Sequence, residues 1–211
     1  MRKAASVALW VVAAACALPA PAAAAIVTRQ DGAGRTITFD VPAGTNVNGY
    51  AGVLRTALHG GEIEHVTIRI VSSTALARSC GGRFVSCYRS GGWHHDAEIL
   101  LPRNRYDGRV LVHEYAHHLD DSYGLTSSRM WREPAARRWW AARRISSRLA
   151  AGQVSDDYDR GWQRAIGEIF AEDFVQLHGR ARYGIEWLPA PNGTVRSAIR
   201  RDVRAAIASG R

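Results

Sequence analysis

The sequence predicts an α+β domain in which a small twisted sheet and a central helix come first and a helical half follows. The chain has 211 residues, 46% hydrophobic and 22% charged, which is enough for one domain with a core. Residues 26–124 contain short alternating or β-branched segments typical of strands. Residues 125–211 instead repeat apolar positions at helical spacing. This order predicts two halves that flank a cleft.

The first 25 residues have the three parts of a secretory signal peptide. Positive charges at Arg2 and Lys3 precede an apolar run, and small residues follow it up to Ala25. The apolar run is too short to cross a membrane. We therefore expect a secreted, extracellular protein that is cleaved near Ala25 and has one domain over 26–211.

Three strands are expected in the first half. The segments 35–41 and 63–73 alternate between apolar and polar residues, and 96–102 is a further short strand that Pro102 ends. A helix over 46–61 connects the first two strands and ends at two glycines.

Removal of the signal peptide leaves two cysteines, Cys80 and Cys87, in a glycine-rich segment. An even number of cysteines in an exported protein is typical of a disulfide. We expect a short-loop bridge between them, with two free thiols as the alternative.

Three helices are expected in the second half, over 128–150, 159–179 and 192–210. The first has an apolar stripe that favours burial. Its other face carries Arg137, Trp140, Arg144 and Arg148. Such a face is either solvated or contacts an anionic cell-wall or membrane surface.

The chain carries a net charge of +9, and loss of Arg2 and Lys3 with the signal peptide lowers it to +7. All remaining basic residues apart from histidine are arginine. A positive charge attracts acidic partners, but coding bias in this alanine-rich chain is the favoured explanation. We expect a monomer without a specific nucleic-acid partner.

Residues 107–124 are expected to form the helix that ends the first half, with Asp107 capping its start and Gly124 ending it. Within it, His113 and His117 are four residues apart, so both imidazoles project from the same face. Two such imidazoles can share a metal, and zinc accepts nitrogen at tetrahedral positions. The alternative is a buried helix whose histidines have other partners.

Glu114 directly follows the first histidine and lies about 100° around the helix from it. At that place it flanks the metal without binding it. A carboxylate there can take a proton from the water that the metal activates and pass it to a leaving amine. The pattern therefore predicts a zinc-dependent hydrolase with Glu114 as its catalytic carboxylate.

A catalytic zinc needs a third protein ligand and an open fourth position. The metzincin class would have glycine and histidine where this chain has Leu119 and Tyr123. The gluzincin class takes a glutamate from a later helix, and the segment GEIFAEDF offers Glu168 and, one turn on, Glu172. We expect Glu168 to bind zinc and Glu172 to accept the second ring N–H of His113, which fixes its tautomer.

Asp121 competes with Glu168 for the role of third ligand. It lies four residues after His117 and eight after His113, roughly on the same helix face. At 1.5 Å per residue it is about 12 Å along the axis from His113, too far for a metal about 2 Å from each ligand. We expect Asp120 and Asp121 to form hydrogen bonds near the helix end or to support a ligand indirectly.

The segment HEYAHHLDDSYG, followed some fifty residues later by EIFAEDFVQLHG, resembles the catalytic domain of anthrax toxin lethal factor and its relatives. That is a gluzincin family of zinc metallopeptidases with the zincin fold. The likeness covers about 110–124 and 165–179. It implies a zincin-like catalytic domain with one Zn²⁺ per chain. The implied zinc ligands are His113, His117 and Glu168, and the implied catalytic carboxylate is Glu114.

The family also carries a tyrosine a few residues before its ligand glutamate, which stabilises the oxyanion. Tyr158 is the nearest tyrosine in this chain, but it lies ten residues before Glu168, farther than in the family pattern. We take Tyr158 as the catalytic candidate, with Tyr183, His178 and Arg164 as rivals.

These motifs predict a secreted zinc-dependent endopeptidase that acts on a protein or peptide. One alternative is an exported, non-catalytic zinc-containing protein that binds through its basic surface. Another keeps the chemistry and hydrolyses an amide of the cell wall. The presence of Glu114 favours the two enzymes over the binding protein, because a carboxylate that binds no metal is needed only for catalysis.

Overall fold

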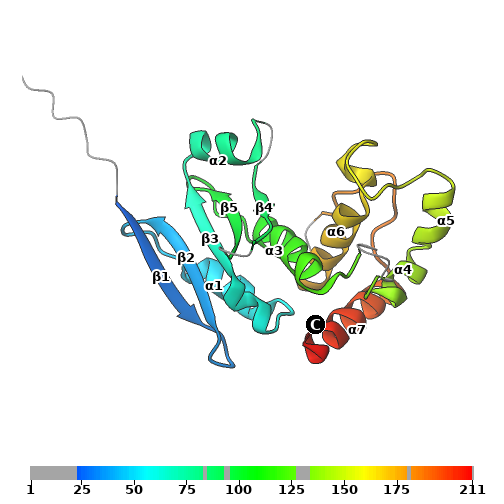
Figure 1. Ribbon diagram of the computed structural model, residues 1–211, viewed down its shortest axis with the longest axis horizontal. Helices are drawn as coiled ribbons and strands as arrows, with labels where there is room; N and C mark the ends of the chain where they lie inside the picture. Colours follow the sequence, from blue (N-terminus) through cyan, green and yellow to red (C-terminus); the bar gives the residue numbers. More distant parts are fainter. Residues whose placement is uncertain (1–22, 83–84, 93–95, 127–133, 180–181, 211) are drawn as a thin grey trace, which may run out of the picture.

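The computed structural model describes residues 23–82, 85–92, 96–126, 134–179 and 182–210. As predicted, they form an α+β structure, with a sheet on one side and the later helices on the other (Figure 1). Most of the predicted signal peptide lies outside the described residues. The first strand begins at Ala24, so Ala24 and Ala25, which the signal-peptide prediction includes, belong to the sheet.

One sheet contains five strands of the described residues. In order across the sheet they are β1 (Ala24–Gln30), β2 (Thr36–Pro42), β3 (Val66–Val71), β5 (Ala97–Pro102) and β4 (Cys87–Arg89). The three inner strands run parallel, and each edge strand is antiparallel to its neighbour. The inner strands confirm the predicted ones. The prediction misses β1, which overlaps the signal-peptide assignment, and β4, which is too short for alternation to be visible.

The two faces of the sheet differ in polarity. On one face, residues such as Ile68 and Ile99 are fully buried. On the other, Arg69 binds Asp40 on the preceding strand at 2.9 Å and Glu98 on the following strand at 3.0 Å. Opposite charges on neighbouring strands stabilise a solvated face. The buried face is therefore the one that helices cover.

Two helices of the first half pack together beside this sheet, α1 (Asn48–Thr56) and α3 (Gly108–Tyr123) (Figure 1). A third helix, α2 (Ser73–Cys80), is missing from the prediction and begins where Ser72 caps the N–H of Ala75. The disulfide between Cys80 and Cys87 joins the last residue of α2 to the first residue of β4. The predicted bridge is therefore present.

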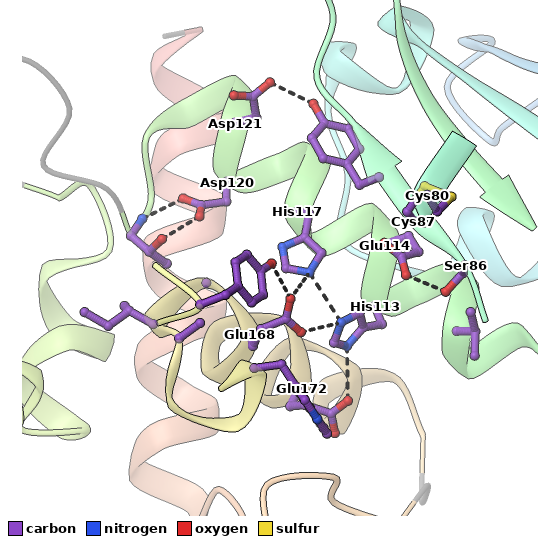
Figure 2. A pocket seen from close by; sticks show the side chains of 18 of the residues that line it. Cys80, Ser86, Cys87, His113, Glu114, His117, Asp120, Asp121, Glu168 and Glu172 are labelled. Carbon is purple, nitrogen blue, oxygen red and sulfur yellow. Dashed lines mark hydrogen bonds and ion pairs between the residues drawn. A yellow bond between two sulfur atoms is a disulfide. The ribbon is translucent and has the colours of Figure 1, made fainter. Parts of the chain in front are cut away.

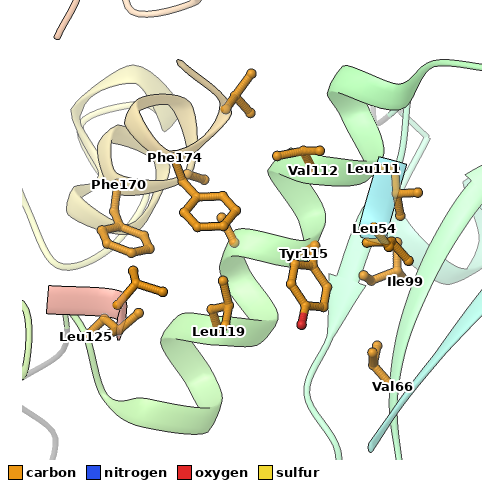
Figure 3. Close-up of a cluster of buried hydrophobic side chains, with 14 of the residues drawn as sticks. Leu54, Val66, Ile99, Leu111, Val112, Tyr115, Leu119, Leu125, Phe170 and Phe174 are labelled. Carbon is orange, nitrogen blue, oxygen red and sulfur yellow. The ribbon is translucent and has the colours of Figure 1, made fainter. Parts of the chain in front are cut away.

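Helix α3 lies between the sheet and the helical half. Asp107 caps its start and Gly124 ends it in the left-handed conformation, as predicted. Figure 3 shows Leu111 and Tyr115 on the side of Leu54 and Ile99, and Phe174 of α6 (Ile166–His178) on the opposite side. One continuous hydrophobic core includes residues from β2 to the last helix, so α3 is fixed from both sides.

The helical half contains α4 (Arg137–Ala142), α5 (Ile145–Ala150), α6 and α7 (Gly193–Ser209), with a short 3-10 turn, η3 (Trp162–Arg164), before α6. The last helix confirms the one expected over 192–210. The second expected helix is shorter than predicted, because only Ile166 onward is α-helical. None of the helices in the described part of the chain has the length and apolar character needed to cross a membrane.

The single helix predicted over 128–150 is wrong in its described part. The chain breaks between α4 and α5, where Arg144 adopts a positive φ of 54°. The break coincides with Arg143, which turns inward to an ion pair with the fully buried Asp173 of α6. The predicted basic face is interrupted too, because Trp140 packs against the core and donates its indole N–H to Ser146.

His178 makes the stability of the fold depend on pH. Its Nε2 accepts the backbone N–H of Leu58 at 3.5 Å, and its ring packs against Phe174. Burial and the positive charge of Arg200 lower the pKa of His178 from 6.5 to about 4. The unfolded chain binds a proton below about pH 6.5, whereas the folded chain binds one only near pH 4. Acidification through this window therefore favours unfolding.

We predict that His178→Gln reduces the loss of stability between pH 7 and pH 5, because glutamine has no proton to gain. Urea unfolding at the two pH values measures the difference for the wild type and the variant. An equal loss in both proteins would show that His178 does not contribute.

Candidate metal centre

Helices α3 and α6 bring His113, His117 and Glu168 together at the centre of the molecule (Figure 2). The two histidines lie one turn apart on α3, and Glu168 lies in the first turn of α6. Glu168 Oε2 is 3.0 Å from His113 Nε2, and Glu168 Oε1 is 3.3 Å from His117 Nε2. The two Nε2 atoms are 3.3 Å apart. This arrangement could hold a metal ion.

Glu172 orients the first of these histidines, as the sequence predicts. Its Oε1 lies 3.1 Å from His113 Nδ1 and also accepts a hydrogen bond from Arg109 of α3. Its Oε2 accepts the backbone N–H of Gly184 at 2.8 Å. A Cβ at position 184 would lie 2.8 Å from that oxygen, so only glycine permits the contact. With Nδ1 donating to Glu172, Nε2 of His113 faces Glu168 and is the nitrogen that a metal would bind.

The electrostatics of this group favour positive charge between the carboxylates. Burial would lower the pKa of His113, but hydrogen bonds with Glu168 and Glu172 raise it to about 10. For Glu168, burial opposes ionisation, but the two histidines hold the pKa of its carboxyl far below the usual value. An ionised Glu168 is the form that binds metals.

Tyr158 reaches the same group from the segment before α6. Its hydroxyl donates to Glu168 Oε1 at 2.7 Å, although 61% of the residue is exposed to the cleft. Burial of the hydroxyl and the charge of Glu168 raise the pKa of Tyr158, so the hydroxyl remains a donor at neutral pH. Although Tyr158 lies ten residues before Glu168 in the sequence, the irregular course of the chain before α6 brings its hydroxyl to that carboxylate.

The three alternative candidates for the oxyanion-stabilising role have other partners. Tyr183 donates to Asp173, on the far side of α6 from the ligands. His178 accepts the backbone N–H of Leu58, just after α1, and Arg164 donates to the backbone of Gln153. Of these four candidates, only Tyr158 contacts a residue of the metal group.

Glu114 is buried beside His113, His117 and Glu168 but is not one of the three residues that could hold a metal. Its Oε1 accepts a hydrogen bond from the hydroxyl of Ser86 at 2.5 Å (Figure 2). Ser86 is itself buried and precedes β4. The sequence analysis misses this contact. The only available signal is that residues 86 and 88 share one face of an extended segment, opposite Cys87.

The two aspartates after His117 have separate partners. Asp121 accepts a hydrogen bond from the Tyr88 hydroxyl of β4 at 2.8 Å, and Figure 2 shows it well away from Glu168. Asp120 accepts the backbone N–H and the hydroxyl of Thr126. The structure thus connects Asp121 to the sheet and Asp120 to the segment that follows α3.

The group opens into a cleft of about 1140 Å³. Residues of α3, the segment from Val85 to Tyr88, and Tyr158 and Trp162 all contribute to its lining. The cleft lies where the two halves of the chain meet, as the sequence predicts.

No protein-family model matches the chain, and a search of the curated proteins finds no significant match.

We predict that Glu168→Ala weakens zinc binding by more than the roughly 10–100-fold typical of losing an outer partner of a ligand. Asp121→Ala should leave the metal in place, because that carboxylate contacts Tyr88. Zinc content after dialysis compares the two variants. Loss of zinc from the Asp121 variant together with retention in the Glu168 variant would overturn the ligand assignment.

Proposed function

We propose that the protein is a secreted zinc-dependent endopeptidase in which His113, His117 and Glu168 bind the metal. One observation carries the proposal. The two imidazole Nε2 atoms lie 3.3 Å apart, a different oxygen of Glu168 lies within 3.0–3.3 Å of each, and Glu114 lies beside them in the same open cleft without joining them. A purely structural metal site has no use for such a carboxylate.

The spacing of the donors supports zinc in particular. Zinc binds nitrogen and carboxylate oxygen at about 2.0–2.2 Å in a tetrahedron, which places neighbouring ligand atoms roughly 3.3 Å apart. Two imidazole nitrogens and one carboxylate oxygen are also the ligand set of well-known catalytic zinc sites, with the fourth position open. The 3.3 Å between the two imidazole nitrogens agrees with that geometry, and the carboxylate of Glu168 lies against both of them.

The arrangement of the elements supports the resemblance to gluzincins. The helix with the two histidines packs beside a small mixed sheet, and the third residue comes from a later helix, as that resemblance implies. We therefore infer a zincin-like fold. The predicted signal peptide and the disulfide support secretion.

The shape of the cleft favours an extended polypeptide as substrate. Three of the six exposed large hydrophobic side chains of the described residues line it: Val85, Tyr158 and Trp162. Strand β4 is an edge strand of the sheet and contributes residues to the cleft wall. An extended chain can pair with such an edge through its backbone.

The chemistry then divides among the residues of the cleft. A zinc ion bound here would act as a Lewis acid that activates water and polarises the scissile carbonyl. Glu114 accepts the proton of the attacking water and delivers it to the leaving amine. The Tyr158 hydroxyl donates to the carbonyl oxygen as negative charge develops on it. Glu172 holds His113 in the tautomer that presents Nε2.

A cell-wall amide is the second candidate substrate, because the same residues would hydrolyse it. A non-catalytic zinc-containing protein that binds through its basic surface is the third candidate. Incubation of the purified protein with a peptide library, with and without a chelator, tests the endopeptidase against the other two. Chelator-sensitive cleavage within peptides supports the endopeptidase, and its absence with a zinc-loaded protein would contradict it.

We predict that Glu114→Gln keeps zinc and lowers the rate of peptide cleavage by about 10²–10⁴-fold, since the proton acceptor is removed. Cleavage rates and zinc content are measured on the same preparation. Full activity in this variant would eliminate the proposed mechanism.

We predict that Tyr158→Phe lowers kcat by about a hundredfold when measured with saturating zinc, because a donor to the developing charge is lost. Tyr106→Phe is the matched control. Tyr106 is also exposed, but its hydroxyl donates to Gly49 outside the cleft. An equal effect of both variants would argue against a catalytic role for Tyr158.

A further inference from the structure

The contact between Ser86 and Glu114 connects the sheet side of the cleft to its central helix. Only 5% of the surface of Ser86 is exposed, and its hydroxyl donates to Glu114 Oε1 at 2.5 Å. The residue lies in an irregular segment, directly before the first residue of β4. Ser86 is therefore held where its hydroxyl has a specific partner.

Two hydrogen bonds and one disulfide hold the segment from Ser86 to Tyr88 in place. Side chains alternate along an extended chain, so Ser86 and Tyr88 face α3 while Cys87 faces away. Ser86 binds Glu114, and two turns farther along α3, Tyr88 binds Asp121. On the opposite side, Cys87 is bonded to the end of α2. The disulfide therefore fixes the residue next to Ser86 to a second element.

The hydrogen bond leaves one oxygen of Glu114 for chemistry. A glutamate side chain has three rotatable bonds, and a proton acceptor must stay within hydrogen-bond reach of the attacking water. The Ser86 hydroxyl occupies Oε1 and restricts the rotation of the carboxylate. Oε2 can then take the proton. Neutral donors placed in this way raise activity by keeping the reacting group in one orientation.

We propose that Ser86 is a positioning residue for Glu114 and that the bridge between Cys80 and Cys87 keeps Ser86 in place. The inference rests on the proposed peptidase function, because it concerns the carboxylate of that reaction. It adds a role for the disulfide beyond stability. Loss of the bridge should reduce activity through Ser86, even where the fold and the metal are retained.

The first experiment compares Ser86→Ala, Ser86→Thr and Ser79→Ala by steady-state cleavage of one peptide. We expect the alanine variant to lose roughly tenfold in kcat with unchanged KM and zinc content, because Ser86 acts on Glu114 and not on substrate binding. Threonine retains the hydroxyl and should restore most of the rate. Ser79 is the matched control, since it precedes Cys80 as Ser86 precedes Cys87 but is exposed.

The second experiment removes the bridge with Cys80→Ser and Cys87→Ser together, alone and in the Ser86→Ala background. If the bridge acts through Ser86, its removal lowers kcat in the wild type and has little further effect when Ser86 is already alanine. Melting temperatures confirm that each variant is folded at the assay temperature. Fully additive losses would mean that the bridge and Ser86 act separately, which overturns the proposal.

Other results would also overturn it. An unchanged kcat in Ser86→Ala would remove the positioning role, and a higher kcat would mean that Ser86 restrains Glu114 instead of preparing it. If the folded, zinc-loaded Ser86→Thr variant were as slow as Ser86→Ala, the hydroxyl would not be the group that positions Glu114. Crystal structures provide a readout independent of activity, with Glu114 in one position in the wild type and several in Ser86→Ala. If no peptide is cleaved by the zinc-loaded wild type, the peptidase proposal fails while this structural comparison still tests the contact.

Discussion

The site depends on one interaction, the interleaving of charged side chains between α3 and α6. Arg109, His113 and His117 follow one another at intervals of four residues on α3, and Glu168 and Glu172 do the same on α6. The order in space is Arg109, Glu172, His113, Glu168, His117, so that each carboxylate lies between two basic groups. Buried charges are tolerated only when they are paired in this way. A shift of one helix by a turn would leave a buried carboxylate without a partner.

Apolar packing fixes the position of α6 along α3 that these alternating charged contacts require. Helix α6 is buried on nearly all sides, with Phe170 and Phe174 in the core, and it cannot slide without opening cavities. Its remaining acidic residue, Asp173, is fully buried and binds Arg143 and the indole N–H of Trp139. That second anchor fixes the rotation of α6 about its axis, so that Glu168 and Glu172 face α3.

Local patterns were sufficient for the parts of the fold and site that repeat with helical or strand spacing. They predicted the limits of α3, the three inner strands, and the meeting of Glu168 and Glu172 with His113. They missed Arg109, Gly184 and Ser86, because each acquires its role from a partner far along the chain. The break before Arg144 was missed for the same reason, since the ion pair of Arg143 with Asp173 depends on tertiary packing and outweighs the helical pattern of the segment.

The residues of the proposed site come from three separate parts of the chain, which meet at the junction of the two halves. The α6 side contributes Glu168 and the segment with Tyr158, the sheet side contributes Ser86, and α3 between them contributes the histidines and Glu114. A change in the distance between α3 and α6 would therefore separate Glu168 from the histidines, and a change in the distance between α3 and the segment before β4 would separate Glu114 from Ser86. The continuous core and the disulfide resist these two movements separately, because the core joins α3 to α6 and the bridge joins β4 to α2. The proposed catalysis requires geometry held to within fractions of an ångström, and the cleft at the junction of the two halves combines these contacts with an opening to solvent.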